Sequence, residues 1–181
     1  MDLTEKQISY EYKFQGKIVN LRVDDALLPN GTTAKREIVE HNGGVCVAPL
    51  DKDYNLYFVK QFRYPYMEVV TELPAGKLEK GENPLDAGKR ELQEECGVTA
   101  GEIISMGTVY PTVAYCSEII YLYAAKNLTA TKQNLDEGEF LDVEKIKLSD
   151  ALNMVMNGEI SDSKTAVLIL KLAKLREEGK F

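Results

Sequence analysis

Apolar and polar residues alternate along much of this chain, with the two-residue period of β-strands that have one buried face. The alternation covers Ile8–Phe14 and resumes at Ile18 after a break at Gly16, which predicts an antiparallel meander. The same criteria predict further strands at 33–40, 45–50, 55–63, 102–110, 118–126 and 140–147. The run Val45–Leu50 is wholly apolar, as expected of a buried central strand.

The segment Pro84–Cys96 changes to the period of an α-helix. Asn83 is a suitable cap, the proline takes a position that needs no amide donor, and Gly97 supplies a left-handed residue after the last turn. The stripe expected to face the core consists of Leu85, Gly88, Leu92 and Cys96.

Two more helices are predicted later in the sequence, and both are expected to pack on the sheet. The first covers 149–157, with Ser149 as its cap and Gly158 as its stop signal. The second covers 161–178 and is predicted to turn four residues toward the core: Ala166, Ile169, Leu170 and Ala173.

Composition narrows the class of protein. A chain of 181 residues that is 44% hydrophobic can form one domain with a sizeable core. Its net charge of −7 argues against binding of nucleic acid, which requires a basic surface. The three cysteines lack a paired spacing, so we expect reduced thiols. No signal peptide or long apolar run is visible, so we expect a cytoplasmic protein that does not enter a membrane.

Three glutamates lie close together on the predicted helix Pro84–Cys96. At about 100° per residue, Glu91, Glu94 and Glu95 cover a narrow arc beside the apolar stripe. Glu91 and Glu95 are four positions apart, so their charges repel by about 0.2–0.5 kcal/mol unless a cation lies between them. Carboxylates with water and backbone oxygens favour Mg²⁺ or Mn²⁺. The alternative is an ordinary solvated acidic face.

The spacing around this helix distinguishes the two interpretations. Gly76 is followed after five residues by Glu82, and after seven more by Arg90–Val98 with the sequence RELQEECGV. This pattern resembles the signature of the Nudix hydrolases at every defined position. The resemblance implies an α/β protein with the Nudix fold, an α/β/α sandwich in which a mixed β-sheet lies between helices. It also implies an enzyme that cleaves a nucleoside diphosphate linked to another group, with Mg²⁺ as cofactor and Mn²⁺ as a substitute.

The same resemblance assigns roles to residues of the motif. Glu91 and Glu95 are expected to bind the metal, the backbone carbonyl of Ala75 to be a further ligand, and Glu94 to assist catalysis. Gly76 would let the chain turn sharply so that this carbonyl points at the metal. Arg90 is placed to pair with Glu94 and hold it in position.

Other phrases are similar to the ADP-ribose pyrophosphatase branch of the family, namely residues 23–31, 61–63 and 72–76. Membership of this branch implies that Arg36 and Arg63 contact the phosphates and the adenosine end of the substrate, a task suited to the guanidinium fork. Glu118 falls on the Ser-Glu pair of the substrate loop and is expected to bind substrate. Glu72 is either a structural or a substrate-contacting acid.

The acidic loop at residues 134–140 contains the candidates for the general base. In the ADP-ribose branch a glutamate of the matching loop takes the proton from the attacking water. Glu137 is the first candidate and Glu139 the second, because both fit the phrase Asp-Glu-x-Glu. The alternative is a polar turn without chemistry.

One position departs from the branch, because Val113 stands where its marker proline is expected. Other substrates therefore remain open, including a different nucleoside diphosphate derivative and a nucleoside triphosphate. A different class of function is a Nudix-fold module that senses a nucleotide without cleaving it. The intact set of Glu91, Glu94 and Glu95 argues against such a module.

The resemblance also predicts how the chain is divided. Residues 1–40 form an N-terminal β element, and residues 41–181 form the Nudix hydrolase domain. In the ADP-ribose branch a comparable N-terminal sheet pairs two subunits, which implies a homodimer, whereas the alternative is a hairpin that caps the core. The expected partner is a small nucleoside diphosphate derivative, with no nucleic acid and no membrane.

Overall fold

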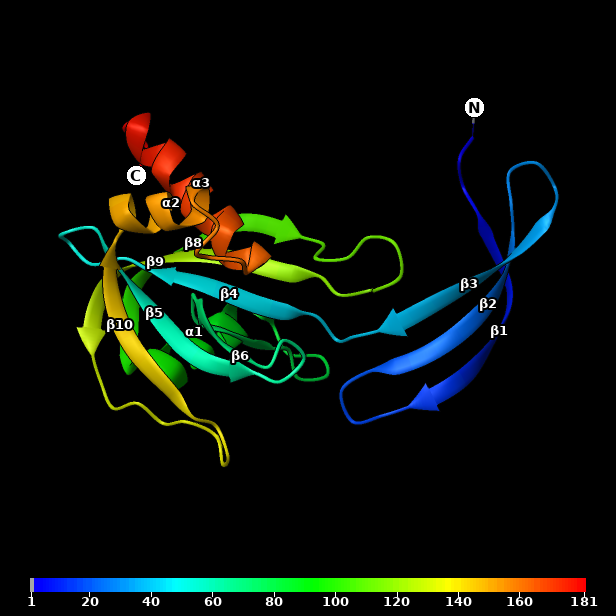
Figure 1. The fold of residues 1–181 in the computed structure, drawn as a ribbon, viewed down its shortest axis with the longest axis horizontal. Helices are drawn as coiled ribbons and strands as arrows, with labels where there is room; N and C mark the ends of the chain where they lie inside the picture. Colours follow the sequence, from blue (N-terminus) through cyan, green and yellow to red (C-terminus); the bar gives the residue numbers. More distant parts are fainter. Residues whose placement is uncertain (1) are drawn as a thin grey trace. The chain divides into compact units, whose positions relative to one another are not determined.

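A computed structural model describes residues 2–181 and divides into two compact units. The first unit runs to Gly43 and also includes Tyr110–Ile119. It contains an antiparallel meander of three strands, β1 (Lys6–Gln15), β2 (Asn20–Leu27) and β3 (Thr33–Glu40) (Figure 1). The predicted meander is therefore present, and Gly31, with a φ of 85°, makes the turn between β2 and β3.

The segment 110–119 is attached to the end of β3 within this unit. The Val39 amide donates to the Tyr115 carbonyl at 2.8 Å, and the Ser117 amide donates to the Val39 carbonyl at 3.0 Å. The strand β1 is exposed along its whole length, and the side chains of Ile8, Tyr10 and Phe14 are each more than half exposed. The meander therefore presents apolar surface that this unit does not cover itself.

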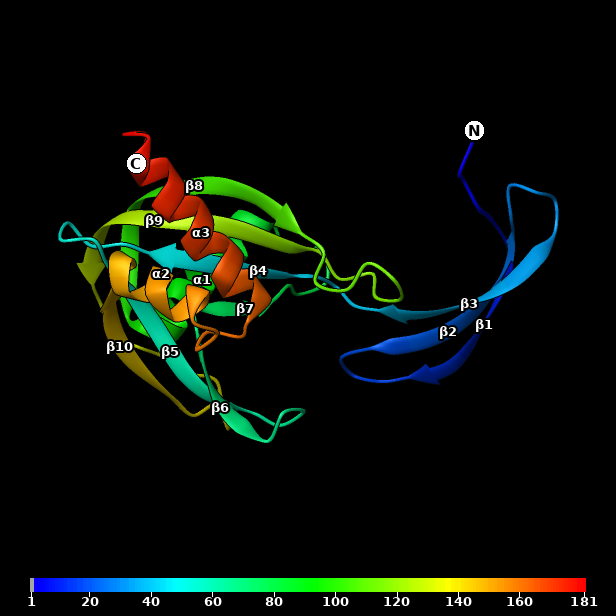
Figure 2. The same cartoon turned by 45° about the horizontal axis from the view of Figure 1, so that its top comes forward.

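The second unit, residues 44–109 and 120–181, contains a mixed sheet and an antiparallel sheet. The mixed sheet has the order β7-β4-β9-β8, where β4 and β9 are parallel. The antiparallel sheet has the order β10-β5-β6 (Figure 2). The strands are β4 (Gly44–Pro49), β5 (Asn55–Arg63), β6 (Glu68–Glu72), β7 (Ala75–Lys77), β8 (Val98–Val109), β9 (Ile120–Ala130) and β10 (Leu141–Lys147).

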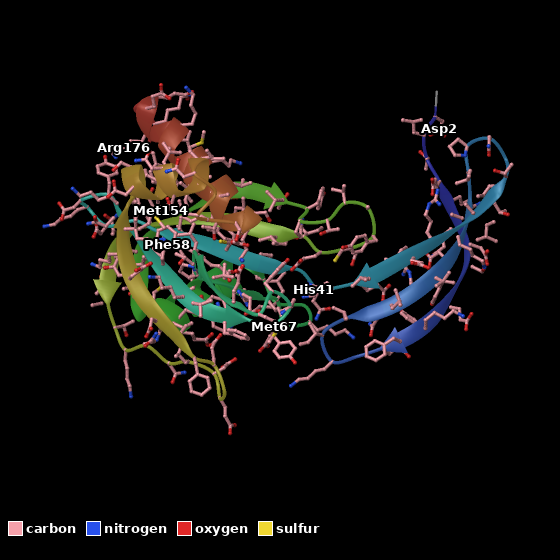
Figure 3. The ribbon with its side chains drawn as sticks, in the orientation of Figure 1. Asp2, His41, Phe58, Met67, Met154 and Arg176 are labelled. Carbon is pink, nitrogen blue, oxygen red and sulfur yellow. The ribbon has the colours of Figure 1, made fainter. Side chains whose placement is uncertain are left out.

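Three helices cover the two faces of β4, and they are α1 (Pro84–Cys96), α2 (Leu148–Met156) and α3 (Ser163–Glu177). Alternate residues of β4 supply two cores, because successive side chains of a strand point to opposite faces. Cys46 and Ala48 pack with Phe58 and with residues of α2 and α3, and Met154 lies against this cluster (Figure 3). Val45 and Val47 pack with residues of α1. The predicted α/β/α sandwich is thereby confirmed.

Local signals in the sequence located most elements correctly. The strands at 33–40 and 55–63 and the helix at 84–96 have the predicted bounds. The short strands β6 and β7 were not predicted, since three to five residues give too few alternations. No helix in the described range 2–181 is long and apolar enough to cross a membrane. All three cysteines are free thiols, as expected.

Three details of the helices were predicted wrongly. Ser149 does not cap α2, since the helix begins at Leu148 and its cap position, Lys147, makes no side-chain capping bond. In α3 Ile169 is buried as predicted, together with Thr165, Leu168 and Leu172, whereas Leu170 is 42% exposed. In α1 Gly88 and Leu92 are buried as predicted, but Leu85 is exposed and the buried residues also include Glu91 and Glu95.

Candidate active site

The helix α1 is fixed at both ends by its own sequence and lies close to the sheet. The Asn83 side chain accepts a hydrogen bond from the Leu85 amide, and Gly97 ends the helix in the left-handed conformation with a φ of 61°. A methyl group at Gly88 would meet Tyr123 and Val47 at 3.4 Å. At this glycine α1 therefore lies close to Val47 of β4 and Tyr123 of β9.

That close packing buries two carboxylates. Glu91 is 9% exposed and Glu95 is 1% exposed, and both face inward from α1. The strand β7 passes directly over Glu91, because a Cβ atom at Gly76 would lie 1.8 Å from its Oε1. A side chain at that position would displace the Glu91 carboxylate, so Gly76 allows this carboxylate to lie against the backbone of β7.

Glu95 has a neutral hydrogen-bond partner. Its Oε2 accepts a bond of 2.9 Å from the Ala75 amide. Burial is the largest influence on this carboxyl, the Ala75 amide opposes it, and the charges of Glu91 and Glu139 add to it, which together raise the pKa of Glu95 to about 8. The ordinary value for a glutamate is near 4.5. The charge of Arg63 also acts to lower the pKa of Glu95, but it does not offset the effect of burial.

Arg90 holds the remaining acids of the motif. Its guanidinium binds Glu82 at 3.0 Å, Glu91 at 2.7 Å and Glu94 at 2.9 Å. The predicted pairing of Arg90 with Glu94 is therefore present in the structure. Glu82 also accepts a bond of 2.9 Å from the Glu79 amide, which ties the loop before α1 to the helix through Arg90.

The donor groups on this face of α1 suit a divalent cation. Buried carboxylate oxygens and backbone carbonyls are the hard ligands that Mg²⁺ and Mn²⁺ take in proteins. Glu91 is directed to Arg90, and within residues 2–181 no three acidic, histidine or cysteine side chains already converge on one metal position. The residues present fit the cation by their chemistry, and the roles of Glu91, Glu95 and Ala75 as ligands remain a prediction.

The predicted substrate residue Arg63 lies at the end of β5 and is bound to Glu72 at the end of β6. Its Nε and Nη2 donate to the two oxygens of Glu72 at 2.6 Å and 2.8 Å. Lys164 of α3 binds the same carboxylate at 2.5 Å. Glu72 is only 2% exposed, so its visible contacts are structural, while Arg63 keeps 36% of its side chain exposed. These contacts hold Glu72 between β5, β6 and α3, and its role toward a substrate stays a prediction.

The acidic loop that follows β9 is tied to the end of α1. The Gln133 side chain donates to the Glu95 carbonyl at 2.6 Å, and the Asn134 amide donates to the Glu94 carbonyl at 3.1 Å. Further along this loop, the charge of Glu139 contributes to raising the pKa of both Glu91 and Glu95. Glu137 is exposed and is not among the leading causes of either shift.

The two other predicted substrate residues belong to the first unit. Arg36 donates through Nε and Nη2 to Glu5 at 2.8 Å and 2.7 Å. Glu118 lies 3.3 Å from Nδ1 of His41. Arg36 and Glu118 thus each pair with a residue of their own unit. Their role in substrate binding remains a prediction.

Lys164 was not predicted as part of the site. It lies in the first turn of an amphipathic helix, where a lysine usually indicates a solvated face. Its partner Glu72 is 92 positions earlier in the chain, and no local pattern relates the two. The phrase Glu72–Gly76 was the only signal for this region.

Comparison with known proteins places the motif in its family. Residues 32–165 match the NUDIX domain. The chain belongs to the Nudix family. Residues 5–39 of this Nudix hydrolase match the nucleoside diphosphate sugar hydrolase N-terminal domain.

Similar proteins cover nearly the whole of this Nudix hydrolase. It is 43% identical to the ADP-ribose pyrophosphatase of Bacillus subtilis (strain 168), over 92% of this chain and 91% of that one. It is 42% identical to the methanol dehydrogenase activator of Bacillus methanolicus, over 91% and 90% of the two chains. A crystal structure of an ADP compounds hydrolase covers all of both chains with a TM-score of 0.86, and its 18% identity shows likeness of fold alone.

Proposed function

We propose that this Nudix hydrolase cleaves the pyrophosphate bond of ADP-ribose to give AMP and ribose 5-phosphate in a Mg²⁺-dependent reaction. One observation carries the proposal: Glu95 of the Nudix motif is 1% exposed, and its bonding partner is the neutral Ala75 amide rather than a cation. The identity of 43% to an ADP-ribose pyrophosphatase supports the choice of substrate.

Each residue of the site has a separate proposed role in the reaction. Glu91, Glu95 and the Ala75 carbonyl would hold Mg²⁺, which would supply positive charge to the phosphates and lower the pKa of a bound water. Arg90 keeps Glu94 in place, since the two are 2.9 Å apart. Arg63 binds the phosphates with the part of its guanidinium that Glu72 does not occupy. Arg36 and Glu118 complete the contacts with the substrate.

Glu139 is the better candidate for the general base than Glu137. A base must come within hydrogen-bond distance of the attacking water, which is held near the acids of α1. The charge of Glu139 is among the leading causes that raise the pKa of both Glu91 and Glu95, whereas that of Glu137 is not.

The first unit is proposed to pair two copies of the chain. The exposed side chains of Ile8, Tyr10 and Phe14 on β1 supply apolar area for such an interface. Residues 1–40 would then be the dimerisation element and residues 41–181 the hydrolase domain. Sedimentation equilibrium checks the homodimer, and replacement of Tyr10 and Phe14 by serine is expected to yield monomers. The three free thiols support a cytoplasmic location.

The substrate is tested by incubating the protein with ADP-ribose, ADP-glucose, GDP-mannose, diadenosine diphosphate, NADH and 8-oxo-dGTP, each with Mg²⁺ and with EDTA. Chromatography of the nucleotide products is expected to show AMP from ADP-ribose at the highest kcat/KM, and none in EDTA. A higher kcat/KM for another compound would show that ADP-ribose is not the preferred substrate, while the proposed hydrolysis of a pyrophosphate bond would stand. Binding of nucleotides without any product would favour a sensing module.

A second candidate function is activation of a methanol dehydrogenase, because a relative of that name is 42% identical over nearly the whole chain. The two candidates are separated by adding wild-type protein and Glu95→Gln to a methanol dehydrogenase assay. Stimulation that survives in Glu95→Gln would indicate activation without hydrolysis. Absence of stimulation by both proteins would leave the hydrolase proposal alone.

A further inference from the structure

Four charged side chains meet where α3 begins beside the end of β6. Arg63 binds Glu72 through two bonds of 2.6 Å and 2.8 Å, and Lys164 binds Glu72 at 2.5 Å. Lys164 also lies 2.9 Å from Oδ1 of Asp162. The four charges cancel, and they alternate in sign in the order Arg63, Glu72, Lys164, Asp162.

The four charged side chains differ in how deeply they are buried. Glu72 keeps 2% of its side-chain surface, Lys164 keeps 13% and Asp162 keeps 17%. Arg63 keeps 36% and is the most accessible member. Lys164 therefore does not present its ammonium to a substrate, and any effect it has on the reaction passes through Glu72 to Arg63.

The same contacts leave Arg63 one free edge. Its Nε and Nη2 are used by Glu72, so Nη1 is not occupied by this pair. A carboxylate held by one guanidinium alone can rotate about its side-chain torsions. A second cation on Oε2 removes that freedom, so the orientation of the Arg63 fork is set before a ligand arrives, which lowers the entropy lost on binding.

The position of Lys164 is itself fixed by the first turn of α3. Asp162 caps this helix by accepting from the Thr165 amide through Oδ2 at 3.0 Å, while its Oδ1 faces Lys164. Thr165 in turn accepts a bond of 2.9 Å from the Leu73 amide. The helix start is thus joined to two consecutive residues, Glu72 and Leu73, immediately before the segment that carries Ala75.

We propose that Lys164 is a positioning residue that locks the Glu72 carboxylate and thereby orients the Arg63 guanidinium toward the pyrophosphate of the substrate. The proposal rests on the proposed function in one respect, the contact of Arg63 with the phosphates. The link from Lys164 to Arg63 stands on the structure of the free protein.

Steady-state kinetics of ADP-ribose hydrolysis test the effect on the reaction. Lys164→Met is expected to raise KM about tenfold, the loss of about one charge-assisted contact, with a smaller change in kcat. Lys164→Arg keeps the charge and is expected to recover most of the affinity. In an Arg63→Met background the same Lys164→Met change should alter KM by less than about twofold, because the residue through which it acts is gone.

The control is Lys174→Met on the same helix, where the lysine is 62% exposed and pairs with Glu177. It is expected to leave KM and kcat unchanged. If Lys164→Met raises KM equally with and without Arg63, or lowers only the melting temperature, the positioning role is wrong. Asp162→Asn is the second variant. It keeps a side chain that can cap the helix but removes the negative charge that faces Lys164. It is expected to raise KM, as Lys164→Met does.

A measurement on the free protein separates this proposal from the proposed function. In a ¹H–¹⁵N correlation spectrum of arginine side chains, Arg63→Lys identifies the Nε–H signal of Arg63. Lys164→Met is expected to speed exchange of this proton with water, and Lys164→Arg to restore its protection. Unchanged exchange in Lys164→Met overturns the proposal. If wild-type protein does not cleave ADP-ribose, the proposed function fails, while this exchange still decides whether Lys164 orders Arg63.

Discussion

Two buried glutamates in the second unit have opposite surroundings. Glu72 is 2% exposed and Glu95 is 1% exposed, so both lose nearly all contact with water. Burial alone raises the pKa of Glu72, but Arg63 and Lys164 outweigh it and the net shift is downward. Burial dominates at Glu95, whose pKa rises to about 8. The charge of Glu72 is therefore balanced by side chains of the protein itself, whereas the charge of Glu95 is not balanced in this way.

The difference shows what each carboxylate does. A buried charge that is paired on both oxygens holds strands and a helix together, as Glu72 does between β5, β6 and α3. A buried carboxylate without a cation is costly to ionise, and a fold retains it where a ligand supplies the missing charge. This contrast agrees with the proposed roles, a metal ligand for Glu95 and a support of Arg63 for Glu72.

The largest effect is expected when Glu95 is replaced by glutamine. Glu95→Gln removes the charge but not the acceptor for the Ala75 amide, so kcat for ADP-ribose should fall about a thousandfold while the fold is retained. The measurement is kcat with saturating Mg²⁺, alongside thermal unfolding in EDTA. The control is Glu102→Gln, an exposed residue of β8. Undiminished turnover in Glu95→Gln would remove this residue from the metal site.

The matching change at Glu72 is expected to act on stability, and on KM through Arg63, rather than mainly on kcat. Glu72→Gln leaves Arg63 and Lys164 facing an uncharged amide in a buried position, which should lower the free energy of unfolding by about 3 kcal/mol. Urea denaturation in EDTA measures this loss. Glu95→Gln under the same conditions should show no comparable destabilisation. Equal losses in the two variants would erase the distinction between the two carboxylates.

The choice between the loop glutamates gives the next largest effect. Glu139→Gln is expected to lower kcat about a hundredfold, the usual contribution of a general base, while KM changes little. Glu137→Gln serves as the matched control, because it lies two residues away in the same loop and is exposed. A large loss of kcat in Glu137→Gln together with little loss in Glu139→Gln would identify Glu137 as the general base.

Residues close in sequence were the ones whose structure could be predicted. Asn83 and Gly97 determine the ends of α1 through contacts within a few positions, and the predicted bounds of this helix were right. The residues of α1 that face the core were harder to predict, because the helical period of 3.6 residues does not distinguish between adjacent arcs of the helix surface. Leu85 was expected inside but is exposed, whereas Glu91, which lies against Gly76 of β7, is buried.

Residues distant in sequence carried the information that was missed. The contact of Lys164 with Glu72 joins positions 92 apart, and the Ala75 amide reaches Glu95 across 20 positions. The motif predicted that Glu95 has a role, but it did not predict that the carboxylate is buried without a cation. The packing of α1 against β7, which buries this carboxylate, could not be read from the motif.

The smallest effect concerns the pH dependence of stability in the absence of metal. The pKa of Glu95 is about 8 in the folded protein and ordinary in the unfolded chain, so its contribution to stability is complete below about pH 4.5 and is lost as the pH rises through 8. In EDTA, the melting temperature of wild-type protein should therefore fall relative to that of Glu95→Gln between about pH 5 and 8.5. Mg²⁺ binds the ionised carboxylate, so it should raise the wild-type melting temperature by a few degrees more at pH 8 than at pH 6. A difference between wild type and variant that does not change with pH would show that Glu95 is already ionised and paired without the metal.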